Sequence, residues 1–330
     1  MNLKSYFCCK LLNMKKFFGF VVIIFFFNAC NDGDVAIQDI SFENVIGANC
    51  DKTVYKIKGN EIIFFKITED DLAFINDQTE KDIPRKYFIN SKNTVTYRTY
   101  NSAVTGANVC AAGTATPSLV EEWTATGGTI EITSTVSKTI GSATIENANS
   151  ETIDGYNMLV IFKNVTFKKP NGEQFYEEFR FGNFKPSFNT LSFSEFSQQP
   201  IKKCSTNSNL TSKIGLSSLI SFDNSVSGLI LNSPTPINSP RTVTITGSNK
   251  LFYRVFENLN LNTYECAKIY LATDTTLKQE WVATTGSVEV TTTTSGGSFI
   301  HKIYLKGVKF KRGNSEFYLG DKFLLGELTL

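Results

Sequence analysis

One alternating pattern of hydrophobic and polar residues occurs twice in the chain. Residues 122–133 contain Trp123, and the same order of residue types returns in residues 280–291 around Trp281, 158 positions later. In each copy branched aliphatic residues alternate with Thr, Ser or Glu, as in a strand with one face on a core and one in water. A glycine-containing tripeptide interrupts each copy and predicts a turn, so we expect two β-hairpins.

The chain contains two tryptophans, and each copy of the pattern holds one. A large aromatic side chain at the start of an alternating strand is typical of core packing, so we expect Trp123 and Trp281 to be buried. The alternative is an exposed tryptophan that stacks against a sugar ring.

Strand signals also occur on both sides of the tryptophan stretches. Residues 53–57 and 61–67 flank Lys58-Gly59-Asn60, which predicts a tight hairpin. Both copies end in a further hairpin, and its hydrophobic phase falters at Lys163-Asn164 and again at Lys306-Gly307. That interruption predicts a β-bulge at the same place in both copies.

Less regular segments lie between these strands. Residues 40–43 predict a first strand, and residues 191–195 resemble them at the start of the second copy. Residues 68–90 have no clear period and receive no assignment. Residues 142–156 are polar and predict a loop insertion in the first copy.

The repeated strand signals predict an all-β chain of two tandem homologous antiparallel β domains, each a sandwich or a small barrel. No strands alternate with amphipathic helices, which argues against an α/β fold. We expect the domains to span 36–187 and 188–330, after a signal peptide at 1–29 and a tether at 30–35.

Cysteine spacing follows the duplication. Cys50 and Cys110 are 60 positions apart, and Cys204 and Cys266 are 62 positions apart. Four cysteines allow three connectivities, and the duplication favours one bridge in each domain, Cys50–Cys110 and Cys204–Cys266. Such bridges persist in an oxidising compartment outside the cytoplasm.

The first thirty residues have the order of an export signal. Basic residues precede an apolar run at 17–27, which is too short to span a membrane, and Asn28-Ala29-Cys30 follows it. This segment resembles the lipoprotein signals of the Bacteroidota, with Phe27 and Asn28 departing from the commonest lipobox. The resemblance implies cleavage before Cys30 and lipidation of its side chain. Translation from Met1 or from Met14 gives the same mature protein.

The composition of the chain limits which partners and cofactors we expect. The chain has 33 basic and 31 acidic residues, and removal of residues 1–29 leaves 29 basic residues, so the mature protein is nearly neutral. No basic patch indicates nucleic-acid binding. The chain has one histidine and no Cys-x-x-Cys pair, so we expect no metal and no other cofactor.

Candidate catalytic residues are few. His301 is not duplicated, since it aligns with Met158, and the sequence indicates no partner for general base chemistry. Glu122 and Glu280 precede the tryptophans, and Arg98 and Arg254 follow tyrosines. We expect a structural cross-strand Glu–Arg pair in each domain rather than an enzyme site.

These observations lead to a functional hypothesis. We expect a lipid-anchored protein of the outer membrane, held through Cys30, with a non-catalytic binding or assembly role. A glycan at the cell surface is the more specific ligand, and an outer-membrane protein is the other partner. The membrane face stays open between surface and periplasm. The alternative is a lipocalin-like carrier that holds a small apolar ligand inside a closed barrel.

Overall fold

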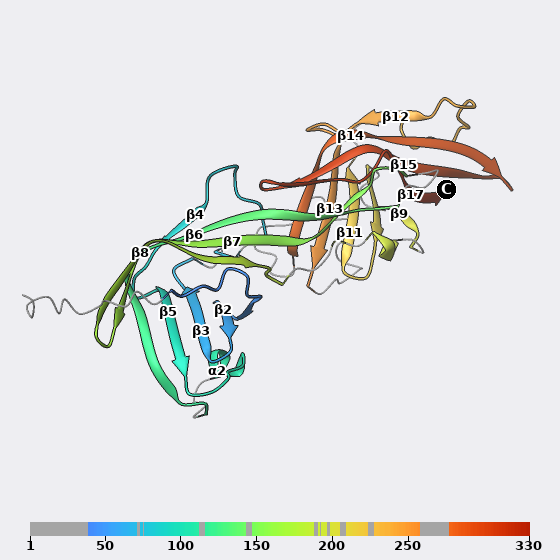
Figure 1. Cartoon of the computed structure of the whole chain (residues 1–330). Helices are drawn as coiled ribbons and strands as arrows, with labels where there is room; N and C mark the ends of the chain where they lie inside the picture. The colour runs from blue at the N-terminus through green and yellow to red at the C-terminus, as the bar shows by residue number, and fades with distance from the viewer. Residues whose placement is uncertain are drawn as a thin grey trace, which may run out of the picture. The chain divides into compact units, whose positions relative to one another are not determined.

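Two antiparallel sheets account for nearly all regular structure in the described part of the chain (Figure 1). The structure is a computed structural model. It describes residues 39–70, 73–74, 76–111, 116–142, 147–187, 191, 193–196, 199–204, 209–223, 228–257 and 277–330. The prediction of an all-β chain with two antiparallel β units is confirmed. Cys30 and the signal segment lie outside the described residues.

The first sheet runs in the order β1-β2-β3-β5-β6-β7-β8, with β4 paired to β6. Its strands are β1 Gly47–Cys50, β2 Thr53–Lys58, β3 Glu61–Ile67, β4 Arg85–Phe88, β5 Asn93–Tyr100, β6 Leu119–Ile140, β7 Glu151–Lys169 and β8 Gly172–Phe184. A short helix, α2 Ala107–Cys110, follows β5. The predicted hairpin between residues 53 and 67 is confirmed, because Lys58 pairs with Glu61 across Gly59-Asn60.

The second sheet runs in the order β16-β15-β14-β13-β11-β10-β9, with β12 paired to β14 and β17 to β15. Its strands are β9 Ile201–Lys203, β10 Leu210–Ile214, β11 Ser218–Asp223, β12 Arg241–Thr244, β13 Lys250–Phe256, β14 Leu277–Ser295, β15 Ser298–Arg312, β16 Ser315–Tyr318 and β17 Lys322–Thr329. A 3-10 turn, η1 Ser194–Phe196, precedes it.

The strand register repeats the duplication. In the first sheet, one row of directly paired residues contains Lys56, Ile63, Tyr97 and Trp123. In the second sheet, the corresponding row contains Lys213, Ile220, Tyr253 and Trp281. The residue types agree at all four positions, so the two sheets share one arrangement of core side chains.

The predicted tryptophan hairpins are wrong. Each tryptophan lies in one long strand, β6 or β14, that continues through its glycine tripeptide. The pairing with β7 shifts on both sides of Gly127, and the pairing with β15 shifts on both sides of Thr285. The glycines therefore mark a bulge within a strand rather than a turn between two strands.

The predicted bulges on the facing strands are confirmed. Asn164 on β7 and Gly307 on β15 have positive φ angles of 50° and 60°, opposite the glycines of β6 and β14. Gly128 has a φ of 118°, and a Cβ there would lie 2.8 Å from the carbonyl oxygens of Lys163 and Asn164. Two irregular backbones thus meet at this bend, and only glycine leaves them enough room.

Two other predictions are corrected. Residues 40–43 form no strand, and the corresponding second segment contains the 3-10 turn Ser194–Phe196 instead. The predicted loop at 142–156 ends early, because β7 begins at Glu151. Ile153 and Tyr156, which the sequence placed in a polar loop, are buried in a core cluster with second-sheet residues. Two inward apolar residues among many polar ones gave too weak a strand signal.

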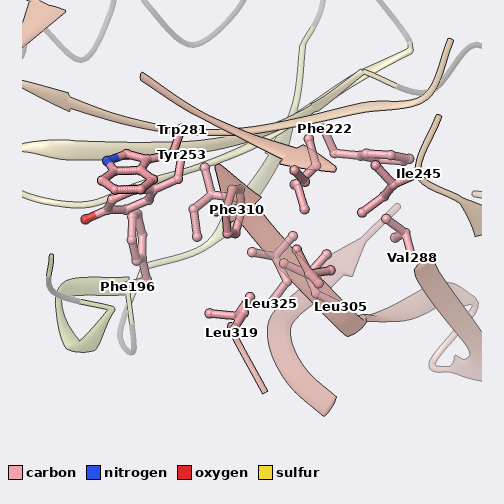
Figure 2. Close-up of a cluster of buried hydrophobic side chains, with 14 of the residues drawn as sticks. Phe196, Phe222, Ile245, Tyr253, Trp281, Val288, Leu305, Phe310, Leu319 and Leu325 are labelled. Carbon is pink, nitrogen blue, oxygen red and sulfur yellow. The ribbon is translucent and has the colours of Figure 1, made fainter. Parts of the chain in front are cut away.

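Aromatic side chains dominate both cores. Trp123 and Trp281 are 1% and 0% exposed, so the prediction of buried tryptophans is confirmed and the sugar platform at these positions is excluded. Figure 2 shows Trp281 beside its cross-strand partner Tyr253, with Phe196 on the other side of the tyrosine ring. In the first sheet the Phe65 ring contacts Phe162 and Phe181.

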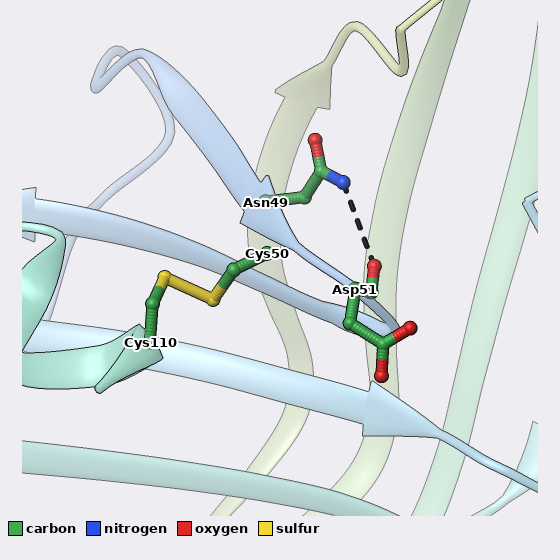
Figure 3. Close-up of a disulfide and its surroundings, with 4 residues drawn as sticks. All are labelled: Asn49, Cys50, Asp51 and Cys110. Carbon is green, nitrogen blue, oxygen red and sulfur yellow. Dashed lines mark hydrogen bonds between the residues drawn. A yellow bond between two sulfur atoms is a disulfide. The ribbon is translucent and has the colours of Figure 1, made fainter. Parts of the chain in front are cut away.

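The Cys50–Cys110 disulfide is present and links the end of β1 to α2 (Figure 3). Asn49, beside Cys50, donates a hydrogen bond to the carbonyl oxygen of Asp51 in the following turn. Cys204 is also disulfide-bonded. Cys266, its predicted partner, lies outside the described residues.

Hydrogen bonds connect residues of the two sheets within the compact unit Ser41–Leu330. The Asp77 carboxylate accepts hydrogen bonds from the backbone N–H and the hydroxyl of Ser315 at 3.1 and 2.7 Å. The Tyr156 hydroxyl also bonds to the Ser315 hydroxyl at 3.0 Å. The backbone N–H of Tyr318 donates to Glu151 at 3.0 Å. These bonds tie β16 to Asp77, in the segment between β3 and β4, and to Glu151 and Tyr156 on β7.

Candidate functional site

The predicted Glu–Arg pairs are confirmed as cross-strand partners. Arg98 Nε lies 2.6 Å from Glu122, and Arg254 Nε lies 2.6 Å from Glu280. Arg254 is buried and also donates to the Ser221 hydroxyl at 3.0 Å. Both arginines lie over a phenylalanine ring of their own sheet. The contacts of each pair are therefore those of a structural cross-strand ion pair.

His301 is buried on β15 and takes part in a short polar chain. Its Nδ1 lies 2.9 Å from the Thr292 hydroxyl, which accepts a hydrogen bond from Arg241 at 2.9 Å. The imidazole tautomer decides whether the hydroxyl or Nδ1 is the donor in this hydrogen bond. Burial lowers the pKa of His301, and Arg241 and Lys203 lower it further. His301 is thus a neutral interior residue in the position that Met158 has in the first sheet.

The described residues contain no group of three His, Cys, Asp or Glu side chains that could hold a metal ion. No helix in that part of the chain has the length and hydrophobicity to cross a membrane.

The sequence did not reveal a pair of buried lysines. Lys56 is fully buried, and its ammonium donates to the carbonyl oxygens of Phe42 and Glu43 at 3.0 and 3.2 Å. Lys213, in the same register position, donates to the carbonyl oxygen of Leu325 at 2.6 Å. Burial lowers the pKa of both, that of Lys56 to about 8 against the opposing effect of the Glu43 carboxylate.

Each buried lysine lies against a glycine of the last strand of its sheet. A Cβ on Gly182 would lie 2.9 Å from Lys56 Nζ, and a Cβ on Gly326 would lie 3.2 Å from Lys213 Nζ. The last strand of each sheet pairs only with strands far along the sheet from the one that carries the lysine. The lysines therefore connect backbone segments that no strand pairing joins. The signal in the sequence was a Lys-Ile dipeptide with its lysine at inward phase, repeated with nearly the same spacing as the tryptophans.

The outward face of the first sheet carries a different set of residues. One cross-strand row contains Phe88 on β4, Thr129 on β6, Lys163 on β7 and Glu178 on β8. Residues paired directly across antiparallel strands point to the same side, so all four face outward together. Phe88 is 72% exposed, which is unusual for an aromatic ring.

A second exposed ring lies on the same face. Phe175 on β8 is 60% exposed. It borders a shallow depression of about 640 Å³, which is lined by Lys163, Asn164, Phe175, Tyr176, Glu177 and Glu178. Lys163 and Glu178 belong both to this depression and to the row that begins at Phe88. We call the surface formed by this row and this depression the aromatic face.

Charges on the aromatic face are paired. Lys163 contacts Glu178 at 2.5 Å, and Lys86 contacts Glu131 at 2.9 Å. Arg180 lies 3.6 to 3.7 Å from carboxylate oxygens of Glu43 and Glu178. The hydrogen bond between Lys163 and Glu178 raises the pKa of the lysine and lowers that of the glutamate, so both stay ionised. The face therefore offers polar groups without a strong net field.

In the described part of the second sheet, other residues occupy the register positions of Phe88 and Phe175. Thr244 occupies the register position of Phe88, opposite Ser287. Tyr318 occupies the position of Phe175, opposite Lys309. The Tyr318 hydroxyl is bonded to Asp321, and its backbone N–H to Glu151. The two exposed rings are thus a property of the first sheet.

The comparisons with known proteins identify no relative. No family model, no curated protein and no solved structure matches the chain.

Proposed function

We propose that this chain is a lipid-anchored protein of the cell envelope that binds a glycan on the aromatic face of its first sheet. The lipobox at Cys30 motivates the anchor, and the exposed Phe175 ring beside paired polar groups carries the choice of ligand. The role is binding rather than catalysis, since the predicted Glu–Arg pairs and His301 are engaged in structural contacts.

The chemistry of the face suits a sugar. The apolar C–H face of a pyranose ring packs on an exposed aromatic ring, as amphipathic ligands do in sites that combine an apolar wall with a few polar groups. Around Phe175, the Asn164 amide and the Glu177 carboxylate can bond to hydroxyl groups. Lys163 and Glu178 satisfy each other in the free protein, so desolvation leaves no isolated charge.

The interior gives little support to the alternative of an apolar carrier. The side chains that would line a lumen in the first sheet contact one another instead: Trp123 packs on Tyr97, with ring centroids 5.0 Å apart, and Phe65 packs on Phe181 at 5.0 Å. The outward face is therefore the better candidate for ligand recognition.

Binding by the full-length protein in detergent to an array of bacterial and plant glycans tests the proposal, with the Phe175→Ala variant beside the wild type. Removal of an aromatic anchor commonly costs more than about 1.4 kcal/mol, so we expect affinity to fall about tenfold or more. Ile237→Ala removes an apolar side chain that is more exposed than Phe175, in the region before β12, and should bind normally. Equal binding by wild type and Phe175→Ala to every glycan would refute the site.

A further inference from the structure

We propose that the aromatic face selects an extended, uncharged glycan chain, longer than a disaccharide, that contacts Phe88 and Phe175 at the same time. This inference rests on the proposed function and deepens it by naming the class of glycan.

The register sets the distance between the rings. Phe88 lies in one row with Glu178, three strands away, and Phe175 lies three residues from Glu178 along β8. Strands are about 4.8 Å apart and rise about 3.3 Å per residue, so the backbone positions of Phe88 and Phe175 are separated by about 17 Å. A single sugar ring or a disaccharide cannot bridge that distance, whereas an extended oligosaccharide can lie diagonally across the strands.

The groups between the rings suit the middle of such a chain. Thr129 and Lys163 occupy the row between Phe88 and Glu178, and Asn164 is at the bulge with its side chain exposed to solvent. Hydroxyl, ammonium and amide groups can donate hydrogen bonds, while the carboxylates of Glu177 and Glu178 accept them. A ligand with many hydroxyl groups uses both kinds along its whole length.

The balance of charges on the aromatic face favours an uncharged glycan. Lys86 lies 2.9 Å from Glu131, and Lys163 and Arg180 lie 2.5 and 3.7 Å from Glu178. With the carboxylate of Glu177, the acids of this set equal the bases in number. A polyanionic glycan would find no surplus of cations in this set and would meet the carboxylate of Glu177. Electrostatic complementarity thus favours a neutral chain over a uronate or a sulfated chain.

The experiment measures calorimetric affinity of the full-length protein for neutral glucan, mannan, xylan and galactan oligosaccharides, from disaccharide to hexasaccharide. Oligogalacturonates of the same lengths serve as anionic probes. Wild type, Phe88→Ala, Phe175→Ala and the double variant are compared, with Ile237→Ala as the control. Because Phe88 and Phe175 are exposed, both variants should fold, and unchanged melting curves check this.

We expect affinity for one neutral series to rise with length, and Phe88→Ala to lower hexasaccharide affinity about tenfold while leaving disaccharide affinity unchanged. Sensitivity to Phe175→Ala but not to Phe88→Ala at any length would overturn the extended site and leave the proposed function standing. Tighter binding of oligogalacturonates would overturn the selection for neutral chains. Binding of no probe, or binding that neither substitution changes, would overturn the inference and the proposed function together.

Discussion

One buried lysine in each sheet connects backbone segments that strand pairing does not join. Lys56 and Lys213 have the same register position, the same burial and the same kind of acceptor, a backbone carbonyl. Burying an ammonium is costly unless hydrogen bonds compensate it, so a duplicated buried lysine indicates a structural role in both sheets. The glycine beside each ammonium provides the space.

The lowered pKa of Lys56 predicts how stability depends on alkaline pH. The folded protein releases this proton near pH 8, and the unfolded chain releases it near pH 10.5, so between these values the unfolded state binds more protons. The free energy of unfolding should therefore rise with pH across this window, by at most about 1.4 kcal/mol per pH unit. Urea denaturation at pH 8.0, 8.75 and 9.5 measures it, since this range lies below the ordinary tyrosine pKa of about 10.

The Lys56→Met variant should lack this contribution, and its stability should rise less steeply than that of the wild type. Lys58→Met, which replaces an exposed lysine of the same strand, is the matched control and should keep the wild-type slope. Parallel slopes for Lys56→Met and the wild type would show that the buried amine titrates normally.

The lowered pKa of His301 predicts how stability depends on acidic pH. Its pKa is lowered by burial, so below about pH 6.5 the unfolded chain takes up a proton that the folded protein resists. Stability should fall as pH decreases from 7.5 to 5.5. The His301→Met variant carries the residue found at the equivalent first-sheet position, and thermal melts should show a smaller loss over this range. An identical loss in both proteins would contradict a buried, neutral histidine.

At the scale of the elements, the two long strands β6 and β14 define the architecture. Each pairs with one neighbour before its glycine tripeptide and with another after it: β6 pairs first with β5 and then with β4. The bulge at Gly127-Gly128 bends the strand between these two partners. The bend also positions the Lys163-Asn164 bulge, which forms part of the aromatic face.

Gly128 and Gly127 provide a matched pair of substitutions. Gly128→Ala forces a side chain into a positive φ and against facing backbone atoms, so we expect a loss of about 2 kcal/mol or more in unfolding free energy. Gly127→Ala meets no atom within 4 Å and should change stability by about 0.5 kcal/mol or less. Chemical denaturation of both variants checks this, and equal losses would argue against the double bulge.

The sequence predicted the strands where alternation was strict and failed where a local signal had two physical meanings. A glycine-containing tripeptide among β-branched residues can form a hairpin turn or a bulge. It is a bulge in β6, because the residues on both sides of the tripeptide pair with β7. The Cys50–Cys110 bridge was predictable because the spacing recurs. Phe88 lay in a segment without a period, and the outward phase of Phe175 depends on the bulge beside it, so the aromatic face could not be predicted.

At the scale of the whole molecule, duplication has produced two sheets with different surfaces. The cores repeat residue for residue in the row that contains each tryptophan, whereas the outward faces diverge. In the second sheet Thr244 replaces the Phe88 ring, and Tyr318 is bonded to Glu151 of the first sheet. This divergence supports the proposal that the ligand binds the first sheet, since the second sheet uses the position corresponding to Phe175 for internal contacts.

Hydrogen–deuterium exchange of the full-length protein, with and without the best-binding neutral hexasaccharide, tests the aromatic face most directly. Bound ligand should slow exchange in peptides that cover β4, the bulge at Lys163-Asn164 and the start of β8 near Phe175. Peptides of β12 and β16 in the second sheet should exchange as in the free protein. Slower exchange confined to the second sheet, with β4 and β8 unchanged, would contradict glycan binding by the first sheet.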